Sequence, residues 1–159
     1  MTGPEGEGEG GVRIQEATAG DVPGIVALLA DDPLGATRET PGDLGPYQAA
    51  FAVVDADPRQ LLVVAERDGR VVGTLQLTLL PGLARVGALR AQVEAVRVAR
   101  DERGSGLGRV LLQWAVDEAR RRGCALVQLT SDGSRVDAHR FYERLGFVPS
   151  HVGFKLALR

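Results

Sequence analysis

Cysteine is nearly absent from this chain of 159 residues, in which Cys124 is the one cysteine. A lone cysteine excludes a disulfide within the chain. Together with two histidines that are far from it and from each other, His139 and His151, it matches none of the spacings of a zinc site. We therefore expect a protein that works without a bound metal.

Long apolar runs are also missing. No run approaches the roughly 20 residues of a membrane-spanning helix, and the first residues lack the basic and apolar regions of a signal peptide. Lysine occurs once, at Lys155, aromatic residues make up 4% of the chain, and the isoelectric point is near 5.7. Nucleic-acid binding therefore has little support. We expect a cytoplasmic protein with neither a membrane nor a nucleic acid as partner.

The chain does have enough apolar residues for a core. They make up 44% of the composition, the formal net charge is −2, and the length suits one domain. Residues 1–11, where glycine alternates with Glu5, Glu7 and Glu9, cannot bury apolar surface, so we predict a disordered acidic, glycine-rich tail there. Residues 12–159 are expected to form a single domain.

Hydrophobic periodicity predicts the order of the elements in this domain. Strands are expected over residues 12–17, 61–66, 70–80, 92–98 and 124–130, with one or two more within 147–158. Helices are expected from Val22 onward, over 46–57, over 109–122, and in the segment 138–147. Antiparallel hairpins followed by a β-α-β crossover imply an α/β (α+β) fold, with a mixed, mostly antiparallel sheet and helices on both faces.

A glycine-rich turn, Arg103–Gly108, joins the strand over 92–98 to the helix over 109–122. Its glycines allow positive φ and close backbone approach, while the first N–H groups of the helix have no partners within the helix. Such a turn suits a phosphate or diphosphate. A tight turn without a ligand remains the alternative for this motif taken alone.

Two other phosphate-binding turns fit less well. A Walker loop ends in Gly-Lys-Ser/Thr, but here Gly108 is followed by Arg109 and Val110, so nucleotide hydrolysis is not expected. A dinucleotide fingerprint requires G-x-G-x-x-G early in a β-α-β unit, whereas this turn has G-x-G-x-G late in the chain.

The segments around the turn resemble the GNAT superfamily of N-acetyltransferases. Arg103, Gly106 and Gly108 match the family's R-x-x-G-x-G/A turn, residues 93–98 (Val-Glu-Ala-Val-Arg-Val) look like its fourth strand, and residues 138–147 look like its A-x-x-F-Y-E-x-x-G-F segment. The predicted order of elements is similar to the GNAT fold from end to end. The resemblance implies acetyl-CoA as co-substrate, with its diphosphate wrapped by the turn.

The resemblance also implies which residues bind this co-substrate. The set comprises Val96, Arg97, Val98, Arg103, Gly104, Ser105, Gly106, Leu107, Gly108, Arg135 and Tyr142. One position departs from the family pattern, because Arg135 stands where the family often has asparagine. A guanidinium pairs well with phosphate oxygens, so Arg135 is expected to contact a phosphate instead.

Two residues are candidates for the catalytic proton transfers. Glu94 precedes Val96 by two positions on a predicted strand, so both side chains are expected on one face, where Glu94 would accept the proton of the attacking amine. An exposed strand glutamate without a role is the alternative. In the family, the tyrosine matching Tyr142 commonly lies against the coenzyme sulfur, which implies a general acid there and a core role for Phe141.

The backbone offers a further group for the reaction. The N–H groups of Val96 and Val98 are expected to polarise the thioester carbonyl if the fourth strand separates from its neighbour as it does in the family. No covalent intermediate is expected, since Cys124 begins a strand at the other end of the helix.

The acceptor is less constrained. Asp31, Asp32 and Glu39 lie in a segment that resembles the family's variable acceptor wall, and their charge suits a cationic amine, although a solvated acidic loop is the alternative. Polar strand residues, Gln76, Thr78 and Gln128, are expected to line the same site. The acceptor is left open among a small amine, an amino acid, an antibiotic and a peptide N-terminus. The protein is expected to be a monomer or a homodimer.

The sequence thus predicts an acyltransferase that moves acetyl from acetyl-CoA to a primary amine of a small molecule or peptide by direct attack. Two rivals stay open. One is a coenzyme-binding regulatory module without catalysis, and the other is a transferase that uses a longer acyl-CoA.

Overall fold

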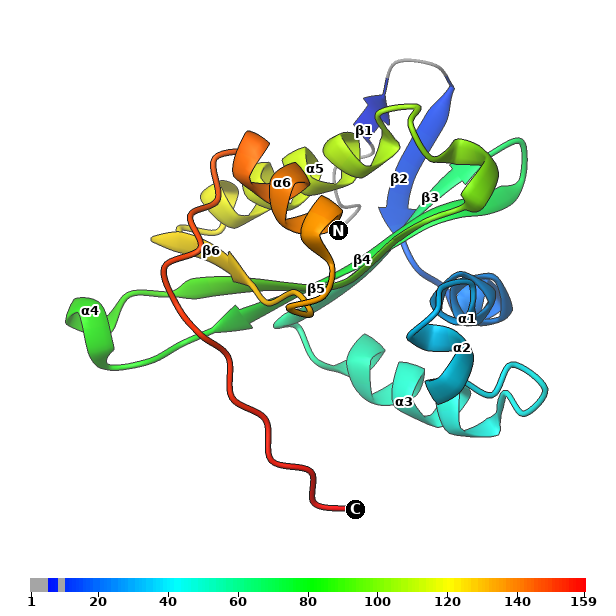
Figure 1. Ribbon diagram of the computed structural model, residues 1–159, viewed down its shortest axis with the longest axis horizontal. Helices are drawn as coiled ribbons and strands as arrows, with labels where there is room; N and C mark the ends of the chain where they lie inside the picture. The colour runs from blue at the N-terminus through cyan, green and yellow to red at the C-terminus, as the bar shows by residue number, and fades with distance from the viewer. Residues whose placement is uncertain (1–5, 9–10) are drawn as a thin grey trace. The chain divides into compact units, whose positions relative to one another are not determined.

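The computed structural model describes residues 6–8 and 11–159. It divides into two compact units, residues 1–128 and residues 129–159. Figure 1 shows the chain coloured from blue at the N-terminus to red at the C-terminus. Residues 1–5 and 9–10 of the predicted tail lie outside the described residues. Within that tail, Gly6–Gly8 forms a short strand that pairs with the strand beginning at Val12.

Apart from the strand at Gly6–Gly8, which was not predicted, and the C-terminus, the described strands agree with the predicted ones to within about two residues. They are β1 (Gly6–Gly8), β2 (Val12–Glu16), β3 (Gln60–Arg67), β4 (Arg70–Leu80), β5 (Arg90–Val98) and β6 (Leu126–Leu129). The helices are η1 (Ala19–Asp21), α1 (Val22–Ala30), α2 (Gly35–Arg38), α3 (Gly45–Ala56), α4 (Ala84–Gly87), η2 (Arg100–Glu102), α5 (Leu107–Arg121) and α6 (Val136–Arg144).

The described strands form a six-stranded sheet in the order β1-β2-β3-β4-β5-β6. Each neighbouring pair from β1 to β5 is antiparallel. The β3–β4 hairpin turns at Asp68 and Gly69, whose φ angles are +51° and +76°. These angles suit the tight turn that Asp-Gly predicts. The mixed, mostly antiparallel sheet is confirmed.

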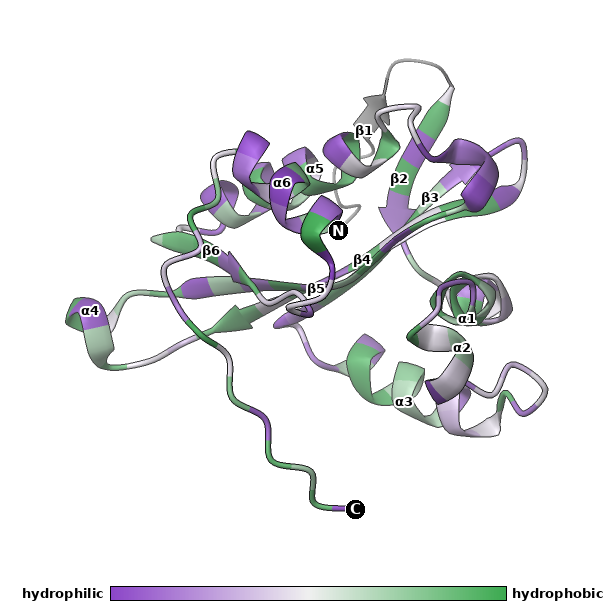
Figure 2. Cartoon of the chain, viewed as in Figure 1, coloured by the Kyte–Doolittle hydropathy of each residue, from purple (hydrophilic) through white to green (hydrophobic). Residues whose placement is uncertain are grey.

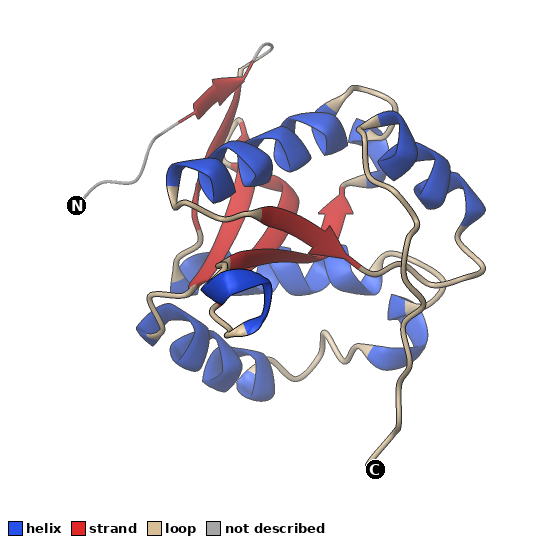
Figure 3. Ribbon diagram, turned by 90° about the vertical axis from the view of Figure 1, so that its left-hand side faces the viewer, coloured by secondary structure: helices blue, strands red, loops and turns tan. Residues whose placement is uncertain are grey.

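Helices cover both faces of this sheet in the first unit (Figure 3). On one face, Val64 packs with Ile25 of α1 and Phe51 of α3. The next residue of β3, Ala65, faces the other way and lies beside Gly73 and Leu111 of α5. A Cβ at Gly73 would lie 3.0 Å from the Leu111 side chain and 3.3 Å from the Ala65 Cβ, so a larger residue there would require these neighbours to shift. The backbone of β4 therefore approaches α5 closely.

α5 is amphipathic, and its buried face includes a charged residue. Leu112 and Glu118 are buried, whereas Val110 and Trp114 are half-buried. The buried residues of this helix are Leu107, Leu111, Leu112, Ala115, Glu118 and Ala119. The predicted end is confirmed by the positive φ of Gly123, +77°.

The second unit contains α6 and a C-terminal segment that differs from the prediction. Residues 145–159, all of which the structure describes, contain no strand, although apolar and polar residues alternate there (Figure 2). Val152, Phe154, Leu156 and Leu158 are 78–93% exposed. A strand also requires a neighbour to pair its N–H and C=O groups, and alternation alone cannot supply that neighbour. The prediction of final strands within 147–158 was therefore wrong.

Candidate functional site

The glycine-rich turn has the geometry of an anion site. Gly104 and Gly106 have φ angles of +82° and +89°, and a Cβ at either position would meet no atom within 4 Å. Gly106 is the N-cap of the 15-residue α5, where no side chain of the described residues caps the helix and no acidic residue occupies the first turn. The first N–H groups of α5 and its positive dipole end therefore suit a phosphate group.

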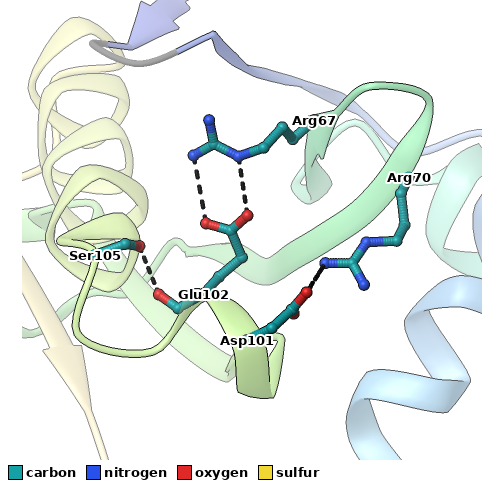
Figure 4. A network of polar contacts seen from close by, with 5 residues as sticks. All are labelled: Arg67, Arg70, Asp101, Glu102 and Ser105. Carbon is teal, nitrogen blue, oxygen red and sulfur yellow. Dashed lines mark hydrogen bonds and ion pairs between the residues drawn. The ribbon is translucent and has the colours of Figure 1, made fainter.

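A network of ion pairs holds the segment before this turn to the β3–β4 hairpin (Figure 4). Arg67 donates two hydrogen bonds to the Glu102 carboxylate, at 2.9 and 3.3 Å. Arg70 pairs with Asp101 at 2.7 Å, and the Ser105 hydroxyl donates to the Glu102 carbonyl oxygen. The bidentate Arg67–Glu102 pair is the less exposed of the two ion pairs and fixes η2, from which the turn departs. Ser105, predicted to bind coenzyme, thus also closes the turn.

The predicted acceptor-binding carboxylates already have cation partners. Asp32 forms an ion pair with Arg97 at 2.8 Å, and both side chains are more than four-fifths buried. Asp31 pairs with Arg100 at 2.9 Å and lies 4.0 Å from Arg103, which also donates to the Asp31 carbonyl oxygen. The loop after α1 is thereby joined to β5 and to the glycine-rich turn. Asp31 and Asp32 balance arginines of this chain, which leaves less negative charge for an acceptor amine.

β5 contains a bulge next to Glu94. Thr74 lies opposite Arg97 and Gln76 lies opposite Glu94, so Ala95 and Val96 together face the single residue Leu75. Ala95 has a φ of +54°, which is unusual for a residue other than glycine. The bulge shifts the alternation of β5 by one residue. Glu94 therefore shares a face with Arg97, and the prediction that it shares a face with Val96 was wrong.

Polar side chains form a row across this face of the sheet. Residues that lie opposite each other in antiparallel strands point to the same side, which places Gln76 with Glu94 and Thr78 with Gln92. The amide oxygen of Gln60 on β3 accepts hydrogen bonds from Gln76 and Thr78, at 2.9 and 2.8 Å. We call the members of this set the polar row: Gln60, Gln76, Thr78, Arg90, Gln92, Glu94 and Gln128.

The remaining members of the polar row form a chain of their own. Arg90 donates to the amide oxygen of Gln128 at 3.2 Å, and the amide nitrogen of Gln128 donates to Gln92 at 3.1 Å. Gln76, Glu94 and Gln128 were expected at the site from the sequence, and this geometry brings them onto one face. Gln60, Arg90 and Gln92 were missed, although the period-two spacing of Arg90, Gln92 and Glu94 on a strand was a usable signal.

The backbone of β5 presents donors on its other edge. The Ala99 N–H bonds to the Val72 carbonyl of β4 at 2.8 Å. Because successive amides of a strand point to opposite edges, the N–H groups of Val98 and Val96 point away from β4. This is the orientation that a carbonyl-polarising role requires.

The second unit carries Tyr142 and Arg135. The Tyr142 ring packs edge-on against Phe141 and Phe147, with centroid distances of 5.3 and 6.0 Å. Arg135 is the N-cap of α6, and its carbonyl accepts the N–H of His139. The His139 ring also contacts the Asp132 carbonyl, at 2.8 Å. The predicted roles of Tyr142 and Arg135 toward a coenzyme remain predictions.

Cys124 has no feature of a nucleophile. Burial raises the pKa of its thiol, and the nearby charge of Arg122 only partly opposes this. Less thiolate is therefore present than at an exposed cysteine. Among the described residues, no three His, Cys, Asp or Glu side chains gather as metal ligands, and no helix is both long and apolar enough to cross a bilayer.

The mostly antiparallel sheet and the open, glycine-lined start of α5 suit an enzyme that takes an acyl group from coenzyme A. The sequence model of the Acetyltransferase (GNAT) family matches residues 24–147. The chain belongs to this family, and its named relatives support an acetyl-CoA-dependent acyltransferase.

Similar proteins have related activities. The chain is 32% identical over 146 residues to an aminoalkylphosphonate N-acetyltransferase of Salmonella typhimurium, covering 92% of this chain and 91% of the relative. It is 34% identical over 142 residues to an L-methionine sulfoximine/L-methionine sulfone acetyltransferase of Pseudomonas paraeruginosa, covering 84% and 78%. Among solved structures, a Bacillus halodurans protein described as a transcriptional regulator is 44% identical, with a TM-score of 0.90 over 92% of this chain and 99% of its own.

Proposed function

We propose that this chain transfers acetyl from acetyl-CoA to the primary amine of a small molecule by direct attack. The observation that carries the proposal is the open, glycine-lined start of α5, which suits a diphosphate, on the strand-to-helix turn that follows the strand of Glu94. Arg103 and the first N–H groups of α5 bind the coenzyme diphosphate. The proposed acceptor amine lies over the polar row.

The chemistry requires a neutral amine. An amine with a pKa near 10 is only about 0.1% neutral at pH 7, which corresponds to a barrier of roughly 4 kcal/mol. Glu94 is exposed on the face of the polar row and accepts the amine proton, directly or through water. The amine nitrogen then bonds to the acetyl carbon while the Val96 and Val98 N–H groups stabilise the carbonyl oxygen. Tyr142 protonates the sulfur as the carbon–sulfur bond breaks, and the second proton that leaves the amine nitrogen passes through water to restore the phenol.

The named relatives support a small amine as acceptor. Aminoalkylphosphonates and L-methionine sulfoximine are small molecules that carry an amine. A peptide acceptor has no comparable support here. The cytoplasmic location, the homodimer and the absence of a metal from the reaction stay predictions.

The regulatory module remains the second candidate, because the 44% identical Bacillus halodurans protein is described as a transcriptional regulator. A module of this kind would bind acyl-CoA without transferring the acyl group. A transferase for longer acyl-CoA would differ from both candidates in the mass of its product.

Calorimetric titration with acetyl-CoA, free coenzyme A and ATP, followed by thiol-release assays over a panel of small amines, tests the proposal. We expect both coenzyme forms to bind, ATP to be silent, and at least one amine to gain the mass of one acetyl group. Glu94→Gln is expected to lower turnover most at low pH, because less of the amine is neutral there and a base is needed more. Tyr142→Phe is expected to lower turnover with unchanged coenzyme affinity. Coenzyme binding without transfer to any amine would favour the regulatory module.

A further inference from the structure

Arg90 is a cation of the polar row that balances no carboxylate. Most arginines of the first unit lie within 4.0 Å of an acidic side chain, including Arg97, Arg100 and Arg103. Among the described residues, Arg90 forms no such pair, and its guanidinium donates to the neutral amide of Gln128. A half-buried cation with only a neutral partner retains the capacity to bind an anion.

The register of the sheet points this cation to the side of Glu94. Arg90, Gln92 and Glu94 alternate along β5 before the bulge, opposite Leu80, Thr78 and Gln76 of β4. All three therefore share one face. The row has a carboxylate at one end and a guanidinium at the other, with neutral amides and a hydroxyl between them.

The amides restrain Arg90. Gln128 accepts from the guanidinium through its oxygen and donates to the Gln92 oxygen through its nitrogen. Because the Gln92 oxygen accepts from Gln128, the NH₂ group of Gln92 is available as a further donor beside Arg90. The Arg90 guanidinium and the Gln92 NH₂ group can therefore donate to the same anion.

The spacing fits a short molecule. At the usual rise of a strand, Arg90 and Glu94 are about 13 Å apart between Cα atoms. Two charge-assisted hydrogen bonds of about 2.8 Å each leave about 7 Å for a ligand. That is the length of a short aliphatic chain with an amine at one end and an acid group at the other.

We infer that Arg90 is the specificity-determining residue of the acceptor site, and that the acceptor is a small primary amine with an anionic group, a phosphonate or carboxylate, on a short chain. This inference rests on the proposed function and names its substrate class. Arg90 and Gln92 hold the anion, which places the amine at Glu94.

The test compares matched amines with the full chain and acetyl-CoA. The substrates are 3-aminopropylphosphonate, 4-aminobutanoate and propylamine, all of which have a three-carbon chain on the amine. Thiol release gives kcat/KM for each. We expect at least about a tenfold preference for an anionic amine over propylamine, or about 1.4 kcal/mol, since a hydrogen bond to a charged group contributes at least that much. The ratio between phosphonate and carboxylate identifies the preferred anion.

Variants separate the role of Arg90 from a structural one. Arg90→Gln should reduce the preference through a higher KM for the anionic amines, so that kcat/KM falls at least tenfold more for them than for propylamine. Arg90→Lys should restore part of the preference. Arg120→Gln removes a charge from an exposed position of α5 and should change neither value. Propylphosphonate, which has no amine, should inhibit wild-type protein competitively and Arg90→Gln at least tenfold more weakly.

Two results would count against the proposals in different ways. Equal kcat/KM for all three amines, or an equal loss for all of them in Arg90→Gln, would overturn the anion-binding role and leave the transferase intact. Transfer to no amine, even at high concentration, together with no propylphosphonate binding by calorimetry, would overturn both.

Discussion

Ala95 determines the direction in which the second half of β5 presents its side chains. An L-residue at a φ of +54° is strained by roughly 1–2 kcal/mol. The strain is compensated by the neighbouring strand and the core, and its effect is to bring Arg97 to the face of Glu94. Arg97 can then reach Asp32 of the loop after α1.

Substitutions at Ala95 test this strain. Ala95→Gly should keep or slightly raise stability, because glycine adopts positive φ without steric cost. Ala95→Val should lower stability by about 2 kcal/mol and reduce acetyl transfer, because a β-branched residue is least compatible with positive φ. Urea unfolding and thiol release measure the two effects. Ala125→Val, at an exposed position without positive φ, is the control, and equal stability of the two valine variants would contradict the strain.

Glu118 is a buried charge at the other end of α5. Its side chain is 3% exposed and accepts hydrogen bonds from Arg121 and Arg122, at 2.6 and 2.7 Å. Burial by itself would raise the pKa of Glu118, but the two arginine hydrogen bonds and their charges outweigh burial and lower it below the usual 4.5. The folded state thus favours the ionised carboxylate.

This lowered pKa predicts a pH-dependent stability. Above about pH 4.5 the carboxylate is ionised in both states, so its full contribution is present, and it is lost as the pH falls through the lower native pKa. Glu118→Gln should therefore cost about 1–2 kcal/mol at pH 7, after allowance for solvent around the arginines, and much less at pH 3. Urea unfolding at both pH values measures this. Asp117→Asn, which removes a carboxylate from an exposed pair with Arg120, should change the free energy of unfolding little at either pH. If Glu118→Gln were as destabilising at pH 3 as at pH 7, the ion pairs of Glu118 would not be the source of its contribution.

At the scale of elements, the function depends on where α5 begins. η2 and the turn hold its first N–H groups clear of any capping side chain, and the Arg67–Glu102 pair fixes η2 to β3. Glycines at both ends of the helix, Gly106 and Gly123, adopt positive φ with no atom within 4 Å of a Cβ. A larger residue would be similarly strained at either position, so the two glycines form a matched pair for mutation.

Gly106→Leu should weaken binding of acetyl-CoA by at least about tenfold, or 1.4 kcal/mol, because the side chain crowds the diphosphate. Gly123→Leu should lose about as much folding stability as Gly106→Leu does, because both place leucine at a positive φ, but it should bind acetyl-CoA as the wild type does. Calorimetry and urea unfolding of both variants provide the comparison. If both variants bound acetyl-CoA as the wild type does, the coenzyme site would have to lie elsewhere.

The loop after α1 competes for cations of the turn. Asp31 holds Arg100 and contacts Arg103 through partly exposed ion pairs, which are individually weak. Asp31→Asn should therefore raise coenzyme affinity about two- to fivefold at low salt, and the gain should shrink as salt screens the charges. Asp117→Asn is the control again, since its carboxylate lies on α5 away from the turn. Unchanged or weaker binding in Asp31→Asn would show that Asp31 supports the turn instead of competing for it.

For the whole molecule, the sequence predicted what local patterns determine. The Asp-Gly hairpin, the glycine-rich turn and the amphipathic α5 follow from turn chemistry and periodicity, and they lie where predicted. The bulge at Ala95 was missed because alanine carries no signal for positive φ. The Asp32–Arg97 pair was missed because it joins segments 65 positions apart. The burial of Glu118 had a local signal, the arginines at i+3 and i+4.

The prediction of C-terminal strands was wrong for a related reason. Alternation in residues 147–158 is a property of that segment alone, whereas strand formation depends on a partner elsewhere in the chain. The site was predictable to the same extent. Motifs marked the glycine-rich turn and the strand of Glu94, whereas Arg90 and Gln92, which the register brings to the same face, belong to no motif.

The exposed C-terminal segment has a practical consequence for an enzyme that acylates amines. Lys155, the one lysine of the chain, is exposed in this segment of the second unit. This chain therefore offers its own activity one lysine side chain, Lys155. An amine-reactive fluorophore at pH 8.5 would accordingly label Lys155 with little competition from other side chains, and its anisotropy would report the motion of the C-terminal segment directly.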